Sequence, residues 1–143
     1  VNDGFGGTDA ADVTVVVTGN NDAPAAADDY LETFGEGPEF LGNLLEDNGS
    51  GPDTDVDLDD ALVVAEVHGV PFVGVYVLDV LWFDEIPIGQ LIVFDNGDAH
   101  YEPGFVAPPD DVLIAPGSFT YTVSDGQGGH DGALVTVDIW GPA

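Results

Sequence analysis

The sequence contains no lysine and no arginine, and against this absence it has 28 aspartate and glutamate residues. The formal net charge of the 143-residue chain is therefore −28. A chain without these cations cannot neutralise phosphate groups, which excludes nucleic acids and anionic membrane surfaces as partners. Repulsion between charges of one sign also destabilises a compact state. A folded form of this chain therefore needs counter-ions, and divalent cations are the simplest ones.

Cysteine is absent as well, which excludes disulfide bonds and thiolate chemistry. The longest apolar stretch, residues 70–83, is too short to span a bilayer and contains Gly74 and Asp79, so we expect no membrane insertion. The chain also lacks the spacing of a zinc site, a phosphate-binding loop or a Ser/His/Asp triad, so we do not expect an enzyme. Hydrophobic residues nevertheless make up 44% of the chain, which is typical of a folded domain rather than a disordered one.

The chain contains an internal repeat. Residues 1–19 and 123–141 align without a gap at an offset of 122 residues, and 11 of the 19 positions are identical. This duplication predicts that residues 1–19 are the last strand of a preceding repeat and that residues 20–141 form one complete repeat. Residues 142–143 would then begin the next linker, and the chain would be an excerpt of a longer protein.

Hydrophobic residues alternate with polar ones in both copies of the repeat and in the segment before the second copy. The alternating residues are Val13, Val15 and Val17; Val135, Val137 and Ile139; and Phe119, Tyr121 and Val123. This period of two predicts strands with one buried face. Further strands are expected at residues 61–67, 72–78 and 81–83, and no helical pattern exceeds two turns. We therefore predict an all-β fold, an immunoglobulin- or cadherin-like Greek-key β-sandwich of about seven strands.

The pair Asn96-Gly97, between two further apolar segments, predicts a hairpin with a two-residue turn. In that register Ile92 and Phe94 point to the core, opposite Tyr101 and Ala99 respectively, and Val93 points outward. It also places Asp95 directly opposite Asp98, which is unfavourable for two like charges.

An acidic loop is the most informative feature for function. It contains seven carboxylates within 15 residues: Glu46, Asp47, Asp53, Asp55, Asp57, Asp59 and Asp60. Alternating aspartates in a flexible loop can direct several oxygens at one hard cation, and calcium accepts six to eight of them in loose geometry. An EF-hand is excluded because its required glycine position holds Asp60. Taken alone, the loop is explained equally well as a solvated acidic stretch.

Three segments resemble the bacterial cadherin-like repeats, also called VCBS or tandem Ig-like modules, of large secreted adhesins. They are Asn20-Asn21-Asp22-Ala23-Pro24; Asn43-Leu44-Leu45-Glu46-Asp47 followed by Asp53-Thr54-Asp55-Val56-Asp57; and Phe119-Thr120-Tyr121-Thr122-Val123-Ser124-Asp125-Gly126-Gln127-Gly128-Gly129. The resemblance covers both ends of the repeat and the acidic loop. Residues 70–90 and 106–117 match no part of the pattern.

The resemblance implies a structural and adhesion repeat of a large extracellular bacterial adhesin, made rigid by calcium where it meets neighbouring repeats of the same chain. Carried over by position, it places calcium ligands at the junction with the preceding repeat, and the acidic loop contributes further candidates. The candidate ligands are Asn21, Asp22, Asp47, Asp53, Asp55, Asp57 and Asp59. The resemblance also implies secretion to the cell surface or the medium.

Two alternatives stay open for the unplaced central segment. It can form a calcium-assisted glycan site in which an exposed Trp82 stacks on surface polysaccharide. It can instead provide an exposed apolar edge that contacts another copy of the adhesin.

The two copies of the duplicated strand compete for one place in the sandwich. We expect residues 135–140 to occupy it, because a short glycine-rich turn connects them to residues 119–124 and closing that hairpin costs little entropy. Residues 13–18 should then be loosely held or should add to an exposed sheet edge.

Overall fold

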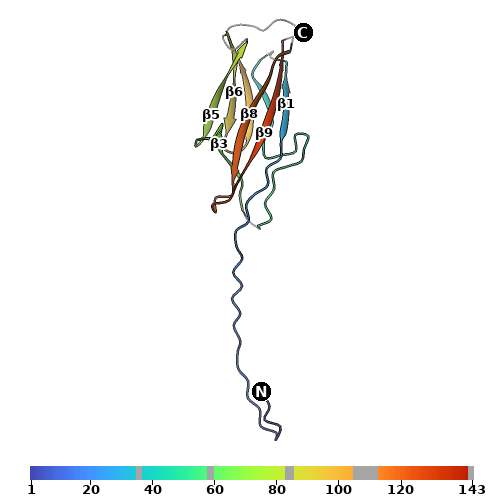
Figure 1. Ribbon diagram of the computed structural model, residues 1–143, viewed down its shortest axis with the longest axis vertical. Coiled ribbons are helices and arrows are strands. Elements are labelled where there is room, and N and C mark those ends of the chain that lie inside the picture. The colour runs from blue at the N-terminus through green and yellow to red at the C-terminus, as the bar shows by residue number, and fades with distance from the viewer. Residues whose placement is uncertain (35–36, 58–59, 83–85, 105–112, 142–143) are drawn as a thin grey trace.

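The computed structural model describes residues 1–34, 37–57, 60–82, 86–104 and 113–141, and it shows a β-sandwich with a long N-terminal tail (Figure 1). No helix occurs among these residues, and therefore none that is long and apolar enough to cross a membrane. The strands are β1 (Asp29–Thr33), β2 (Glu39–Asn43), β3 (Val63–Val67), β4 (Val70–Pro71), β5 (Val75–Trp82), β6 (Ile86–Phe94), β7 (Asp98–Pro103), β8 (Leu113–Ser124) and β9 (His130–Trp140).

The strands form two sheets that pack face to face. One sheet has the order β1-β9-β8-β3-β4, and the other has the order β2-β7-β6-β5. Strand β1 pairs with β9 in parallel, and all other neighbours are antiparallel. The predicted all-β immunoglobulin-like sandwich is confirmed, with nine strands in the described part of the chain rather than about seven.

The core lies between the sheets and follows the alternation in the sequence. On β9, the side chains of Val135, Val137 and Ile139 are at most 1% exposed. On β8, Phe119, Tyr121 and Val123 are buried against them. The opposite sheet contributes mainly Ile88, Leu91, Val93, Ala99 and Tyr101. The period-two pattern therefore identified the inward faces of β8 and β9 correctly.

The β6–β7 hairpin forms, but its predicted register is wrong by one residue. Val93 pairs with Ala99, so that Leu91 and Val93 face the core and Ile92 and Phe94 face outward. A two-residue turn of the type that favours Asn-Gly needs positive φ at both central residues. Here only Gly97 has it, at +95°, and its N–H donates to the Phe94 carbonyl at 2.9 Å, so the loop takes one more residue. A one-residue shift moves every side chain of the strand to the other face.

Tertiary contacts of Asp95 favour the longer loop. Its carboxylate accepts the N–H of Gly74 at 2.9 Å, and its carbonyl accepts the N–H of Val64 at 2.8 Å. Asp95 therefore belongs to the loop and does not lie opposite Asp98, which removes the expected contact between like charges.

The C-terminal copy of the duplicated strand occupies the sandwich, as expected. Strand β9 pairs with β8 over its whole length, whereas residues 10–19 form an extended segment outside both sheets (Figure 1). Val13, Val15 and Val17 are 85%, 75% and 87% exposed. The tail leaves from the end of the sandwich that carries the β8–β9 turn, called the base from here on. The domain boundaries expected at residues 19/20 and 141/142 stay predictions, and residues 142–143 lie outside the described part of the chain.

Deletion of residues 1–19 should leave the sandwich folded, because the valines of this tail bury no surface against it. We expect cooperative thermal unfolding, followed by circular dichroism, with a melting temperature within a few degrees of the full chain. Loss of the cooperative transition would show that the tail belongs to this sandwich.

Candidate metal centre

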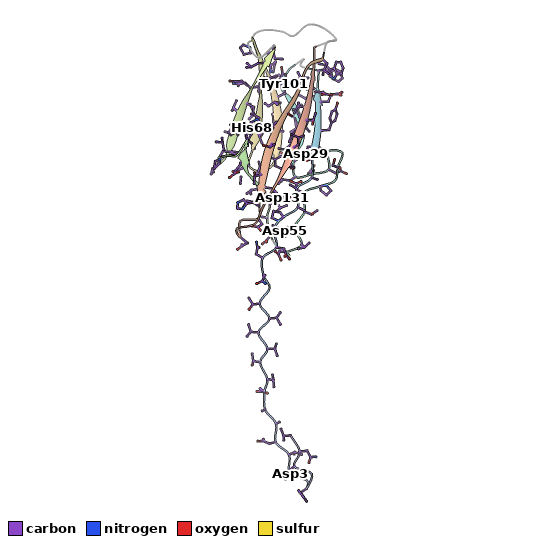
Figure 2. The ribbon with its side chains drawn as sticks, viewed as in Figure 1. Asp3, Asp29, Asp55, His68, Tyr101 and Asp131 are labelled. Atoms are coloured by element: carbon purple, nitrogen blue, oxygen red, sulfur yellow. The ribbon has the colours of Figure 1, made fainter. Side chains whose placement is uncertain are left out.

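Acidic side chains from two separate segments meet at the base of the sandwich. Asp55 and Asp60 come from the long loop between β2 and β3, and Asp125 comes from the turn between β8 and β9. Figure 2 shows Asp55 and Asp131 at this end, where the N-terminal tail joins the sandwich. The sheets bring these segments together although up to 70 residues separate them in the sequence.

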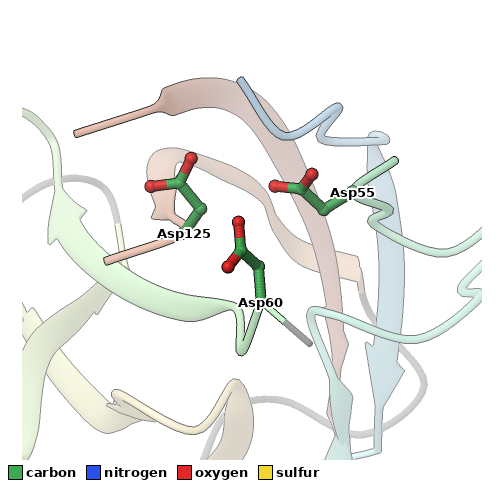
Figure 3. A group of neighbouring side chains, drawn as sticks. All are labelled: Asp55, Asp60 and Asp125. Atoms are coloured by element: carbon green, nitrogen blue, oxygen red, sulfur yellow. The ribbon is translucent and has the colours of Figure 1, made fainter. Parts of the chain in front are cut away.

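Asp55, Asp60 and Asp125 each direct one carboxylate oxygen at the same small space (Figure 3). These three oxygens all lie within 4.8 Å of one another. Two oxygens bound to one calcium ion can be at most about 5 Å apart, so this spacing suits a shared ion. We call these three residues the base cluster.

The β8–β9 turn holds Asp125 in place. Its Oδ1 accepts the N–H groups of Gln127 at 2.7 Å and Gly129 at 2.9 Å, and the residue is 3% exposed. Gly129 is required here, because a Cβ on it would collide with the Asp125 carboxylate. The side-chain amide of Asn21 donates to Oδ2 at 2.8 Å, and this bond, with the two from the backbone, lowers the pKa of Asp125.

The linker before the sandwich is tied to the same place. Asn21 contacts Asp125, and the N–H of Asp22 donates to Oδ2 of Asp57 at 2.7 Å. Asp57 in turn donates its own N–H to Oδ1 of Asp55 at 2.8 Å. Two consecutive linker residues therefore contact both the acidic loop and the β8–β9 turn.

Asp55 provides the observation that points to a ligand. Its Oδ2 is buried and has no hydrogen-bond partner, although it lies among other carboxylates. A buried carboxylate oxygen without a partner is costly, and neighbouring negative charges increase that cost. A cation at the base cluster would remove both penalties.

The structure brings together four of the seven predicted ligands: Asn21, Asp22, Asp55 and Asp57 lie in or next to the base cluster. Asp47 lies elsewhere in the loop, where its Oδ1 accepts the N–H groups of Gly49 at 3.0 Å and Gly51 at 2.9 Å. Asp53 points into the sandwich, and Asp59 lies outside the described residues.

Two members of the base cluster were not among the predicted ligands. Asp60 belongs to the same acidic loop, so the sequence placed it close to the site. Asp125 opens the segment Asp-Gly-Gln-Gly-Gly, which the sequence marks as a turn. Only the pairing of β8 with β3 and β9 places that turn beside the loop.

Asp53 is held inside the sandwich by Tyr121. The Tyr121 hydroxyl donates to Oδ2 of Asp53 at 2.8 Å, and the N–H of Ala27 donates to Oδ1 at 2.7 Å. The same hydroxyl lies 3.1 Å from the carbonyl oxygens of Ala27 and Leu44. Burial raises the pKa of Asp53, and that of Tyr121 rises for the same reason.

Asp29 is a second buried carboxylate near this tyrosine. It is 4% exposed, its Oδ1 accepts the side-chain amide of Asn48 at 2.8 Å, and its Oδ2 has no hydrogen-bond partner. Burial raises the pKa of Asp29 to about 6. Near neutral pH Asp29 is therefore charged, and the burial of this charge destabilises the folded state.

Residues 21–138 match the family model of the bacterial Ig domain. The chain belongs to the bacterial Ig domain family. This confirms the resemblance to bacterial Ig-like repeats and agrees with the two-sheet sandwich. The bacterial Ig domain is a non-catalytic fold family, and the match includes the linker residues Asn21 and Asp22 as well as the base cluster. No match to a curated protein was found.

The Ig domain should become more stable, in the absence of metal, as the pH falls from 7 towards 4. The pKa of Asp29 is higher in the folded state than its ordinary value of 3.8, so its protonated form favours folding and that contribution is lost as the pH rises through about 6. Asp29→Asn imitates the protonated form. It should raise the free energy of unfolding by roughly 1–3 kcal/mol at pH 7 and change little near pH 4, measured by denaturant unfolding in EDTA.

Glu32→Gln is the control, since it removes the same charge from an exposed position of the same strand. This variant should keep the pH profile of the parent chain. Equal behaviour of the two variants would show that Asp29 is not responsible for the profile.

Proposed function

We propose that this Ig domain is a calcium-binding structural repeat of a large extracellular adhesin, in which calcium at the base cluster makes the junction with the N-terminal segment rigid. The buried, unpartnered Oδ2 of Asp55 carries this proposal, because it belongs to a carboxylate that shares a small space with those of Asp60 and Asp125. Asn21, Asp22 and Asp57 lie beside the cluster and offer further oxygens. All donors are oxygens, which favours a hard cation, and flexible loops suit calcium better than the strict octahedron of magnesium.

The charge of the whole chain supports an extracellular role. A net charge of −28 without lysine or arginine leaves the fold dependent on cations in the surroundings. Extracellular calcium modules bind with a Kd of about 10⁻⁴–10⁻³ M, so they fill where calcium is plentiful. A site of this kind would keep the repeat rigid outside the cell.

Stiffening follows from the contacts of the linker. Asn21 and Asp22 are bonded to Asp125 and Asp57, on two different segments of the base. An ion bound by Asp55, Asp60 and Asp125 would lock these segments together and so fix the direction in which the tail leaves. In a series of such repeats, the same device would convert a flexible string into a rod.

Calcium should raise the melting temperature of the full chain relative to EDTA. Binding to the folded state alone adds RT ln(1 + [L]/Kd), about 2.7 kcal/mol at a calcium concentration one hundred times Kd. Asp55→Asn should abolish most of this gain, while its metal-free form is as stable as the parent chain or slightly more so, because one repulsive charge is gone. Calorimetric titration and thermal unfolding measure both effects.

Asp47→Asn is a matched control, because Asp47 and Asp55 lie in the same loop and each accepts backbone N–H groups through Oδ1. It should retain the full calcium response. A melting temperature that is identical in EDTA and in millimolar calcium would refute the proposed site, and an equal loss in both variants would move it to another part of the loop.

A contact function is the second candidate, and a row of apolar and histidine side chains on the outer face of the four-stranded sheet favours it. Phe40, His100, Ile92 and Val77 are paired across β2, β7, β6 and β5. Phe40 is 56% and Val77 47% exposed, and the rings of Phe40 and Phe94 lie 5.2 Å and 5.5 Å from that of His100. This row lies next to a sheet edge on an otherwise acidic molecule, and it would suit another copy of the adhesin. The glycan alternative depends on Trp82, whose side chain lies outside the described residues.

A dimer through this row should form at micromolar concentration in calcium and disappear in Val77→Asp, as measured by sedimentation. Leu134→Asp, which changes a 42% exposed residue on the outer face of the other sheet, should leave the dimer intact. A monomer at all these concentrations would remove the contact function from consideration.

A further inference from the structure

The tail repeats the β8–β9 turn in three dimensions as well as in sequence. Asp3 Oδ1 accepts the N–H groups of Phe5 at 2.8 Å and Gly7 at 3.0 Å, as Asp125 Oδ1 accepts those of Gln127 and Gly129. The glycines between them also correspond, with φ of 80° and 91° at Gly4 and Gly6 and of 78° and 102° at Gly126 and Gly128. Figure 2 shows Asp3 at the far end of the tail. The loop therefore forms without any sandwich around it.

The residues after this loop have the inward face of β9. Val13, Val15 and Val17 align with Val135, Val137 and Ile139, which are at most 1% exposed in the core. On the outward face Thr14 matches Thr136, but Val16 stands where β9 has Asp138. The positions that a sandwich would bury are thus identical or change only from isoleucine to valine, so the tail is suited to lie between two strands such as β1 and β8.

The tail cannot fill this place in its own sandwich. A β9-like strand begins at the base and ends at the opposite end, so its 11 residues cover about 36 Å. Gly19, the counterpart of Gly141, would then lie at that opposite end. Asn21 is bonded to Asp125 at the base, and two residues span at most about 7 Å. The sandwich that receives the tail must therefore be a different one.

We propose that residues 1–19 are the last strand of a second sandwich of this same fold, and that it is stacked end to end on the base of the first. The tail occupies the β9 position of that second sandwich. Asp3 holds the turn before this strand by accepting two backbone N–H groups, as Asp125 does in the first sandwich. Because Gly19 ends the strand two residues before Asn21, the far end of the second sandwich lies against the base cluster. The assignment itself does not depend on a bound metal, although it would place the proposed calcium site between two sandwiches.

The test supplies the missing sandwich from the chain's own sequence. Residues 20–122, which lack the last turn and strand, are fused directly in front of Val1 of the full chain. If the tail completes this added part, the fusion contains two sandwiches and should show about twice the calorimetric unfolding enthalpy of the full chain. Both halves should also resist limited proteolysis.

Two single substitutions in the tail of the fusion test which face is buried. Val15→Asp, the counterpart of the buried Val137, should unfold the added part and reduce the enthalpy to that of one sandwich. Val16→Asp reproduces the outward Asp138 of β9 and should retain both sandwiches. An enthalpy of one sandwich with the unchanged tail would overturn the assignment, as would equal behaviour of the two variants.

A further variant checks the strand without the fusion. In the full chain, residues 123–141 are replaced by the sequence of residues 1–19, which changes eight positions. The sandwich should fold with a cooperative transition, because all inward residues are kept or change only from isoleucine to valine. Failure to fold would show that the tail sequence cannot act as this strand. Loss of calcium binding alone, with folding intact, would count against the metal site and leave the strand assignment standing.

Discussion

The carboxylates of this Ig domain have no lysine or arginine to pair with, and the rest of the structure depends on how they are held. Backbone N–H groups bond to Asp125 and Asp53, the Tyr121 hydroxyl bonds to Asp53, and the Asn48 amide bonds to Asp29. These bonds replace the salt bridges that an ordinary acidic protein would use. They leave the Oδ2 atoms of Asp29 and Asp55 without partners, and the latter lies where three carboxylates converge. Because the chain has no lysine or arginine, no side chain of these two types can offset the cost of these oxygens.

Hydrogen bonds at the base connect the sandwich to the linker that precedes it. The linker, the acidic loop and the β8–β9 turn all end there, and each reaches the others through carboxylate oxygens. Polar groups continue into the interior next to the base, because the Tyr121 hydroxyl donates to Asp53 and lies 3.1 Å from two backbone carbonyl oxygens. Hydrogen bonds of the linker, the acidic loop and the β8–β9 turn are therefore concentrated at one end of the sandwich. The opposite end carries none of these bonds among the described residues.

Several features could be derived from the sequence because they depend on local rules. Alternation identified the inward faces of β8 and β9, and the short glycine-rich turn between them explained why the C-terminal copy occupies the sandwich. The acidic loop and the linker asparagine and aspartate identified the neighbourhood of the base cluster. Strands β1 and β2 were not predicted, because two of the three buried positions of β1 hold the polar residues Asp29 and Thr33, and Glu39–Asn43 has no buried residue.

The sequence by itself determined the fold class and the inward faces of the duplicated strand, since the period of two is a property of the chain. Only the tertiary structure decided the partners of each carboxylate. Asp47 and Asp53 resemble Asp55 in sequence. In the structure, however, a turn directs Asp47 to the backbone N–H groups of Gly49 and Gly51, and strand pairing directs Asp53 into the core. Likewise Asn96-Gly97 predicts a hairpin, but contacts of Asp95 with Gly74 and Val64 decide its register. Packing of the two sheets decides which segments far apart in the sequence come into contact, and the local sequence pattern does not specify these contacts.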